Sequence, residues 1–322
     1  MIVRWGLEEL APVLREVGMG RPLLVASKRW SSADVGVAVA DVWSEVPSDR
    51  IADAGEAARA ADGILALGGG SAIDLAKAIS AETGLGVVSV PTTYAGAEWT
   101  TSFGIRDPDR RMTGAGAGAR LAGIVYEPRL TLSLGRGETV GTAMNALAHC
   151  AEALYARGHN AAADARALDG AALINEHLPR VVEAPDDLHE RTQLLRGAAA
   201  GGEALALAGL ALGHALAQAI GGRYGLPHGA LNAICLPAAL EFNQAVAQEA
   251  VSRFGRALGT DDPVGRVREL AHLGGFERLR DLGVRADDLD DLAEAAASRA
   301  GARANPRPAS PADVAELLRS IW

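Results

Sequence analysis

The residues from Asp62 to Ala78 constrain the fold of this chain more than any other stretch. An apolar run over 64–67 leads into three glycines and a serine, Gly68 to Ser71, and then into helical spacing. A buried strand that turns at glycines into a helix is the basic unit of a parallel α/β sheet. The glycines let the backbone approach a ligand, and the free N–H groups at a helix start favour a phosphate. We therefore predict a phosphate-binding turn at 68–71, with a tight turn that binds nothing as the alternative.

A second turn of the same kind follows later in the chain. The apolar run 87–90 ends in Pro91, Thr92 and Thr93, and Tyr94-Ala-Gly96 comes next. A strand that ends in a proline-fixed turn with two hydroxyl groups also suits a phosphate or a ribose. Two such turns in one α/β region support each other.

An earlier strand, expected over 22–27, places two polar residues at its end. Ser27 and Lys28 lie just past the apolar run. Ligands of open α/β sheets bind at the carboxyl ends of the strands, so this position is suited to a nucleotide ribose or its phosphate. A solvated loop is the alternative interpretation.

The remaining patterns divide the chain into two halves. Up to Arg129 we expect further strands at 1–5 and 121–126, helices at 8–17 and 50–61, a helix–strand pair at 35–46, and a hairpin or mobile loop at 106–119. After Arg129 nearly every segment has the 3.6-residue period of a helix. The helices expected there are 142–156, 161–177, 188–212, 231–242, 248–258, 263–273, 287–300 and 311–321. The sequence thus predicts an α/β domain at 1–129 and an all-helical domain at 130–322.

Composition excludes several classes of partner. The chain has 322 residues and a net charge of −9 with dispersed acidic residues, which does not favour nucleic acid or an anionic membrane. The longest apolar runs, such as 204–212, are far too short for a bilayer span. The two cysteines, Cys150 and Cys235, stand in helical and apolar contexts that suggest reduced thiols. We expect a cytoplasmic protein.

Three histidines and two amides mark the helical half. Asn145 and His149 are four residues apart, as are His214 and Gln218, so each pair shares one helix face. His228 follows in a Gly-Leu-Pro-His-Gly loop. Neutral imidazole binds Zn²⁺ or Fe²⁺ well, whereas an amide oxygen is a weaker ligand than a carboxylate. The alternatives are a divalent metal or catalytic site and hydrogen-bonded core histidines.

Taken together and in order, these motifs resemble one family. The GGGS turn, the PTTYAG turn, MNALAHCAEALYA at 144–156, GLPHG at 225–229 and NPRP at 305–308 are similar to those of group III, iron-containing alcohol dehydrogenases, and most of all to maleylacetate reductases. The resemblance implies a dehydroquinate synthase-like fold, with an N-terminal Rossmann-like parallel-sheet domain, a C-terminal helical domain and the active site in the cleft between them. Relatives of this kind are usually homodimers.

The resemblance also implies a cofactor and a set of site residues. It implies NADH or NADPH as the cofactor and a divalent metal, Fe or Zn, as a further ligand. A serine at position 27 with Lys28 beside it would tolerate the 2′-phosphate of NADPH. The implied nucleotide-binding residues are Gly68, Gly69, Gly70, Ser71, Asp74, Thr92, Thr93, Ser27 and Lys28. The implied metal ligands are Asn145, His149, His214 and His228, and the implied catalytic residues are His149, His214, His228, Gln218 and Tyr94. For Tyr94, simple packing is the alternative.

Three positions depart from the resemblance. Gln218 stands where relatives carry a histidine of the proton relay, Met112 where reductases carry a lysine, and Ala238 where a histidine is expected. Glutamine cannot act as a general acid near neutral pH. We therefore expect a reductase of a small carbonyl or keto-acid related to maleylacetate. The alternatives are a non-redox lyase, dehydratase or cyclase on the same scaffold and, less favoured, a non-catalytic binding protein.

Overall fold

The computed structural model describes all residues from Met1 to Trp322 and divides into two compact units. The first unit comprises Met1–Thr93 and Ala97–Ser133, and the second comprises Tyr94–Gly96 and Leu134–Trp322. The change of unit therefore falls at Ser133, a little beyond the expected position at Arg129. The structure also assigns the short segment Tyr94–Gly96 to the helical unit, which no periodicity in the sequence suggests.

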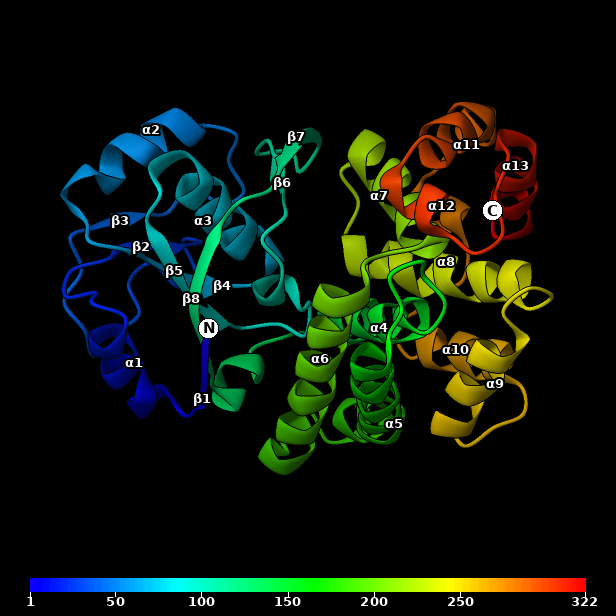
Figure 1. Cartoon of the computed structure of the whole chain (residues 1–322), viewed down its shortest axis with the longest axis horizontal. Coiled ribbons are helices and arrows are strands. Elements are labelled where there is room, and N and C mark those ends of the chain that lie inside the picture. Colours follow the sequence, from blue (N-terminus) through cyan, green and yellow to red (C-terminus); the bar gives the residue numbers. More distant parts are fainter. The chain divides into compact units, whose positions relative to one another are not determined.

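The first unit is built on a six-stranded sheet in the order β1-β8-β5-β4-β2-β3, with every neighbouring pair parallel (Figure 1). Its strands are β1 (Ile2–Trp5), β2 (Leu23–Ala26), β3 (Asp41–Trp43), β4 (Ile64–Gly68), β5 (Gly86–Pro91) and β8 (Arg120–Tyr126). The central strands are buried on both faces, which is why they occur as continuous apolar runs rather than alternating patterns. The fold class is thus the predicted one.

Helices cover both faces of this sheet. On one face α1 (Leu10–Glu16), preceded by a 3-10 turn at Leu7–Glu9, packs in a cluster that includes Leu24 and Leu65. On the other face α2 (Ile51–Ala57) and α3 (Gly70–Thr83) contribute to a cluster that includes Leu23 and Ile64. The adjacent strand residues point to opposite faces because side chains alternate along a strand.

Two connections of the first unit test finer expectations. The helix expected at the start of 35–46 is absent, and only the strand β3 forms. Gly36, with φ of 68°, lies in the left-handed region, and too few residues separate it from β3 for a helix. The region 106–119 is the predicted hairpin, formed by antiparallel β6 (Phe103–Arg106) and β7 (Met112–Gly116).

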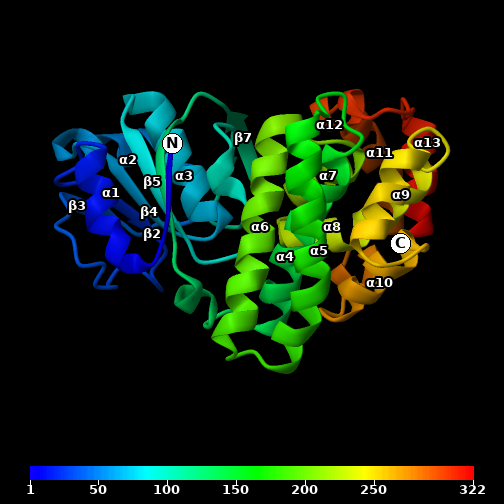
Figure 2. The same ribbon diagram turned by 60° about the horizontal axis from the view of Figure 1, so that its bottom comes forward.

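The second unit is a closely packed set of helices. They are α4 (Arg136–Ala153), α5 (Ala161–Glu183), α6 (Leu188–Ala208), α7 (Leu212–Tyr224), α8 (His228–Asn243), α9 (Gln248–Ala257), α10 (Pro263–His272), α11 (Leu289–Ala297), α12 (Ala300–Ala304) and α13 (Pro311–Ser320). Helices α4, α5 and α6 lie side by side, as Figure 2 shows. A Cβ at Gly201 would lie 2.7 Å from the Ala146 carbonyl oxygen, and one at Gly229 would lie 2.4 Å from the Gly141 carbonyl. Small residues therefore let α6 and α8 approach α4 directly.

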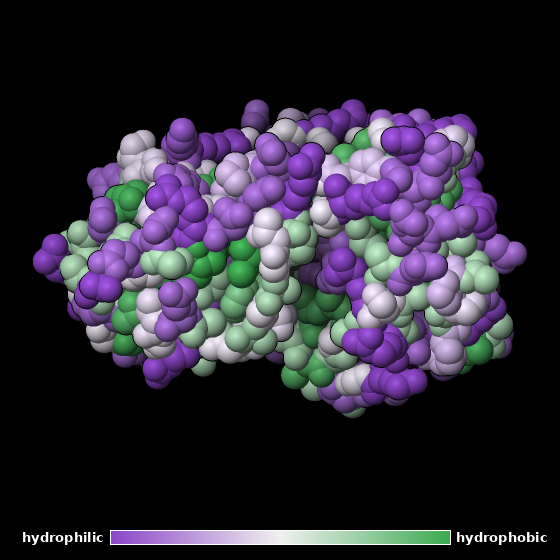
Figure 3. Space-filling view, turned by 90° about the horizontal axis from the view of Figure 1, so that it is seen from above, coloured by the Kyte–Doolittle hydropathy of each residue, from purple (hydrophilic) through white to green (hydrophobic).

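The surface of the chain is mixed in character. Hydrophilic residues are interspersed with apolar ones over the face seen in Figure 3. No single helix has the length and apolarity needed to cross a membrane, although the bent pair α6 and α7 meets the criterion when taken together. Most residues of that pair are buried in the helical unit.

Candidate functional site

In the first unit, the two predicted phosphate turns lie next to each other. β4 and β5 are adjacent parallel strands with Gly68 opposite Pro91, and the Thr92 amide donates a 3.0 Å hydrogen bond to the Gly68 carbonyl. A Cβ at Gly69 would lie 2.8 Å from Cγ2 of Thr93. Glycine at position 69 is thus required for the second turn to pack against the first.

The start of α3 offers donors to an anion. Its N-cap, Gly69, forms no side-chain capping bond, so the backbone N–H groups of Gly70 and Ser71 are open to a ligand. β2 neighbours β4, which places Ser27 and Lys28 at the same edge of the sheet as these turns. The arrangement within this unit suits a nucleotide whose pyrophosphate lies at 68–71 and whose ribose lies near Ser27.

Asp74 was predicted to bind the cofactor, but its carboxylate oxygens contact a lysine and a backbone amide of the protein. One carboxylate oxygen lies 2.8 Å from Nζ of Lys77, and the other accepts a 3.3 Å hydrogen bond from the Gly104 amide. Lys77 is 1% exposed and also donates to the carbonyls of Ala97 and Ser102. Asp74 therefore ties α3 to the neighbouring loop and strand.

In the second unit, the predicted histidines converge from three helices. His149 lies on α4, His214 on α7 and His228 at the first position of α8. The ring centroids of His149 and His214 are 4.7 Å apart, and those of His214 and His228 are 5.6 Å apart. His149 and His214 are buried, whereas His228 is partly exposed. The three predicted histidines thus lie close together, with His228 at the start of a helix and not in the loop expected from the sequence.

Asn145 occupies the centre of this cluster in one fixed orientation. Its Nδ2 donates a 2.8 Å hydrogen bond to the Ala95 carbonyl, which leaves Oδ1 facing the imidazoles. Oδ1 lies 3.3 Å from Nε2 of His214 and 2.6 Å from Nδ2 of Asn232. The segment Tyr94–Gly96 belongs to the helical unit and supplies this orienting carbonyl.

A fully buried carboxylate supports His214. Glu152, on α4, accepts hydrogen bonds from the Ala211 amide at 2.6 Å, the His214 amide at 3.0 Å and Nδ1 of His214 at 2.9 Å. The N-cap of α7, Ala211, has no capping side chain of its own, so Glu152 caps that helix from α4. One carboxylate therefore fixes both the start of α7 and the orientation of the His214 ring.

His149 is held as a neutral imidazole. Burial lowers the pKa of His149 well below its usual value, and the rings of His214 and His228 lower it further. Nδ1 of His149 is buried without a hydrogen-bond partner. Its Nε2 faces Nδ2 of Asn145 at 3.4 Å. The cluster therefore combines one neutral ring with a ring, His214, that is backed by a carboxylate.

The predicted metal ligands do not converge on one point. A divalent cation needs lone pairs about 2.0–2.2 Å away, but the His149 and His214 ring planes are near-parallel, at 16°. The Asn232 amide nitrogen lies within hydrogen-bonding distance of both Asn145 Oδ1 and His228 Nε2. No group of three or more His, Cys, Asp or Glu side chains is arranged to hold a metal ion. The residues therefore do not form a ready metal site, and metal binding stays a prediction.

The other predicted residues have varied positions. Tyr94 is fully buried and its hydroxyl accepts a 3.2 Å hydrogen bond from the buried Arg191, so it packs inside the helical unit rather than lining a surface. Gln218 lies one turn along α7 from His214 and is partly exposed. Ala238 is buried in the helical core, and Met112 pairs with Arg106 in the hairpin.

Two residues of the site were missed by sequence reasoning. Glu152 is three residues beyond His149 on α4, and Asn232 is four residues beyond His228 on α8, so each lies one turn from a predicted histidine. The one-turn spacing that paired Asn145 with His149 would also have found them.

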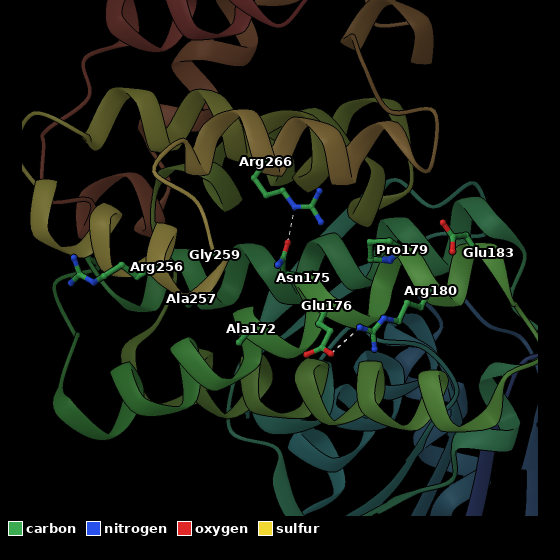
Figure 4. Close-up of a pocket in the computed structure, with 10 residues that line it drawn as sticks. All are labelled: Ala172, Asn175, Glu176, Pro179, Arg180, Glu183, Arg256, Ala257, Gly259 and Arg266. Carbon is green, nitrogen blue, oxygen red and sulfur yellow. Dashed lines mark hydrogen bonds and ion pairs between the residues drawn. The ribbon is translucent and has the colours of Figure 1, made fainter.

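A hollow of about 570 Å³ lies elsewhere on the helical unit, between α5 and the segment formed by the end of α9, Gly259 and α10 (Figure 4). None of the predicted site residues lines it. Its three arginines already have partners: Arg180 pairs with Glu176, Arg256 pairs with Glu249, and Arg266 donates to Asn175. The hollow thus presents no unpaired cation to a ligand.

Comparison with known proteins agrees with both halves of the chain. Residues 5–122 match the model of the iron-containing alcohol dehydrogenases, and residues 139–322 match that of the C-terminal region of the Fe-containing alcohol dehydrogenase family. A maleylacetate reductase of Pseudomonas knackmussii is 39% identical over 237 residues, which cover 73% of this chain and 67% of the relative.

Solved structures show the same relationship. The crystal structure of maleylacetate reductase from Rhizobium sp. strain MTP-10005 has 30% identity and a TM-score of 0.89, covering 100% of this chain and 95% of that one. Sulfoacetaldehyde reductase from Bifidobacterium kashiwanohense, solved with NAD⁺, shares the fold at 20% identity and a TM-score of 0.88, with coverage of 100% and 96%. Iron-containing alcohol dehydrogenases use NAD(P)H and a metal. The chain belongs to this family of NAD(P)-dependent oxidoreductases acting on CH–OH and C=O groups, and it is close to the maleylacetate reductases.

Proposed function

We propose that this protein reduces a small carbonyl or keto-acid substrate, related to maleylacetate, with NADH or NADPH. The observation that carries the proposal is the pairing of His214 with the fully buried Glu152 inside a cluster of three imidazoles. The relatives named above are reductases, so the non-redox and non-catalytic alternatives find no support among them.

The hydrogen bonds around His214 suit a proton donor. Nδ1 donates to the Glu152 carboxylate, and Nε2 faces Asn145 Oδ1, which is an acceptor. With Nδ1 held by Glu152, Nε2 is the ring nitrogen that carries the transferred proton in the proposed reaction. In the proposed reaction a hydride from the nicotinamide reaches the carbonyl carbon, and the Nε2 proton of His214 passes to the carbonyl oxygen. Glu152 stabilises the imidazolium before transfer and holds the ring in place after it.

The other side chains of the cluster have supporting roles. His149, neutral because of its burial, provides an uncharged wall beside His214. His228 is the partly exposed member of the cluster. Gln218, one turn from His214, can donate an amide hydrogen bond that orients the substrate.

The first experiment separates cofactor binding from chemistry. Titration with NADH and NADPH by fluorescence tests the nucleotide turns, and loss of NAD(P)H absorbance with a panel of keto-acids, ketones and aldehydes tests turnover. We expect nucleotide binding and oxidation with at least one carboxylate-bearing ketone. His214→Gln should keep the nucleotide affinity and lose turnover. Absence of nucleotide binding at millimolar concentration, or full turnover by His214→Gln, would refute the proposal.

The nucleotide preference has its own test. Ser27 and Lys28 place no negative charge at the end of β2, so the proposal includes binding of NADPH as well as NADH. Ser27→Asp would put a carboxylate near the ribose, where it repels a 2′-phosphate and accepts from a 2′-hydroxyl. We expect this variant to weaken NADPH binding selectively. Equal effects on both nucleotides would show that the ribose lies elsewhere.

Two further proposals complete the functional description. We propose a homodimer, which sedimentation or size-exclusion chromatography of the purified chain tests directly. We also propose a cytoplasmic enzyme, consistent with two buried cysteines that form no disulfide. Fractionation of cells that produce the protein tests the second point.

A further inference from the structure

The guanidinium of Arg191 lies inside the helical unit. Arg191 is on α6 and is 1% exposed. Its Nε donates a 2.6 Å hydrogen bond to the Pro185 carbonyl, in the loop before α6, and its Nη1 donates to the Tyr94 hydroxyl at 3.2 Å and to Oγ1 of Thr139, on α4, at 3.5 Å. One side chain therefore joins the loop before α6, helix α4 and the segment Tyr94–Gly96.

Two features of this position disfavour a cation. Arginine keeps its charge when it is buried, and its removal from water is costly unless good hydrogen bonds replace the lost hydration. Arg191 is also the fourth residue of α6, near the positive end of the helix dipole. An apolar side chain would fill the same space without either cost. What Arg191 adds is therefore its set of hydrogen bonds, and the bond to Tyr94 leads toward the histidine cluster.

Tyr94 is fixed at its ring and at its backbone. Its side chain is fully buried, its hydroxyl accepts from Arg191, and its amide donates a 3.4 Å hydrogen bond to Oγ1 of Thr142 on α4. The carbonyl of the next residue, Ala95, accepts the 2.8 Å hydrogen bond from Nδ2 of Asn145. Because Tyr94 and Ala95 are adjacent in the chain, the position of the Tyr94 ring sets where the Ala95 carbonyl meets Asn145.

Gly96 shows how closely the segment fits. A Cβ at Gly96 would lie 3.2 Å from Cα of Gly202, on α6, and 3.4 Å from Nδ1 of His149, on α4. Gly96 also has φ of 74°, in the left-handed region that glycine adopts without strain. The segment thus runs between α4 and α6 against the His149 ring. A shift of the segment would therefore disturb its contacts with both Asn145 and His149.

We propose that Arg191 is a positioning residue of the reductase site. It holds the Tyr94 ring, so that the Ala95 carbonyl orients Asn145 and Gly96 lies against the His149 ring. It acts through Tyr94 and not by contact with the substrate, because its guanidinium is closed off from solvent. The effect on turnover rests on the proposed function, whereas the hold on the segment is a property of the resting protein.

A set of variants tests the contact between Arg191 and Tyr94. Arg191→Met keeps most of the side-chain volume and removes every donor, whereas Tyr94→Phe removes only the hydroxyl and so provides a milder variant if the first folds poorly. The double variant tests whether the two side chains act through one contact. Arg191→Lys keeps a cation that can donate to Tyr94, but it lacks the fork that also reaches Pro185.

Val251→Ala is the matched control for a loss of stability. Val251 is buried on α9, which packs mainly against α5 and α10. Its truncation destabilises the helical unit from a helix other than α4 and α6. A variant that lowers kcat only by weakening the fold would behave as this control does.

Hydrogen–deuterium exchange followed by mass spectrometry reports on the segment directly, in the peptide that contains Tyr94–Gly96. We expect faster exchange there in Arg191→Met and Tyr94→Phe, because the segment opens locally, and wild-type exchange in Val251→Ala. Steady-state kinetics report the consequence for turnover. The kcat of Arg191→Met and of Tyr94→Phe should each fall about 10- to 100-fold. The double variant should lose no more than the weaker single variant, and Arg191→Lys should recover part of the loss.

Unchanged exchange at Tyr94–Gly96 in both single variants would overturn the proposal. Additive losses of kcat in the double variant would do the same, as would an equal loss in Val251→Ala. If the wild type reduces no carbonyl, the proposed function fails, but the exchange comparison still decides whether Arg191 holds the segment.

Discussion

Glu152→Gln is the most informative single change in this protein. The carboxylate is fully buried and accepts three N–H groups, from Ala211, the His214 backbone and the His214 ring. Glutamine keeps the size but has only one acceptor oxygen. In the more favourable orientation of glutamine, its oxygen takes the place of Oε2 and still accepts from the Ala211 amide and from Nδ1 of His214. Its amide nitrogen then takes the place of Oε1, so the His214 backbone N–H loses its acceptor.

The cost follows from these contacts. An unsatisfied buried N–H costs about 1–3 kcal/mol, and each of the two remaining bonds weakens by about 1 kcal/mol when the acceptor loses its charge. The expected loss in the free energy of unfolding is therefore about 3–5 kcal/mol. For a domain of this size that corresponds to a fall in Tm of about 6–20 °C. The His214 ring also loses its fixed tautomer, so kcat should fall by about 10- to 100-fold.

Urea unfolding followed by circular dichroism measures the first effect, and NAD(P)H oxidation measures the second. Glu176→Gln is a suitable control, because that side chain is 53% exposed and pairs only with Arg180 and, at longer range, the His177 ring. We expect it to change stability by less than about 0.5 kcal/mol. If Glu152→Gln unfolds within about 1 kcal/mol of the wild type and keeps its kcat, then the carboxylate neither caps α7 nor orients His214, and the reasoning is wrong.

Three further predictions concern the same contacts and the first unit. In Gly213→Ala the new Cβ would lie 2.8 Å from Oε1 of Glu152. We therefore expect the free energy of unfolding, measured in urea, to fall by about 1–3 kcal/mol. The control Gly137→Ala, with nothing within 4 Å of the new Cβ, should be neutral or stabilising. Burial raises the pKa of Glu98 above its usual 4.5, so the stability it contributes is complete below that value and is lost as pH rises through the folded-state pKa. Glu98→Gln should therefore gain stability relative to the wild type between pH 4.5 and neutrality; an equal difference at pH 4 and pH 8 would contradict this. Asn145→Asp adds a carboxylate to the cluster and should raise zinc affinity by at least about tenfold, measured by metal analysis after dialysis; unchanged zinc content would show that charge does not limit binding.

Much of the fold could be predicted because its signals are local. The strand, glycine turn and helix at 62–78 appear where the sequence places them, as does the change to helical periodicity after the α/β half. The helix expected at 35–46 failed because apolar spacing alone does not account for the left-handed Gly36 or for the few residues before β3. Local patterns predict a helix or strand well where the segment is long enough and its turn residues agree with the hydrophobic periodicity.

The residues of the site lie at one-turn spacings that the sequence shows, but the contacts between them could not be predicted. His149, His214 and His228 were found from spacing, and the structure brings them together. The cap that Glu152 provides to α7 joins residues 59 positions apart in sequence, so no local motif reveals it. Likewise the assignment of Tyr94–Gly96 to the helical unit depends on hydrogen bonds such as that from Asn145 to Ala95. These are tertiary contacts that only the folded chain shows.

The charges around the cluster explain why the amide at position 145 matters. Glu152 is the carboxylate that contacts the histidines, and its oxygens already accept three N–H groups. A single proton added to His214 is balanced by that one negative charge, whereas a divalent cation beside neutral Asn145 would leave a buried positive charge without compensation. An aspartate at position 145 would supply the missing charge but would repel the Ala95 carbonyl that the amide now contacts. The single buried carboxylate beside the histidines thus matches the role proposed for His214, and Asn145→Asp tests whether a second negative charge lets the cluster hold a metal.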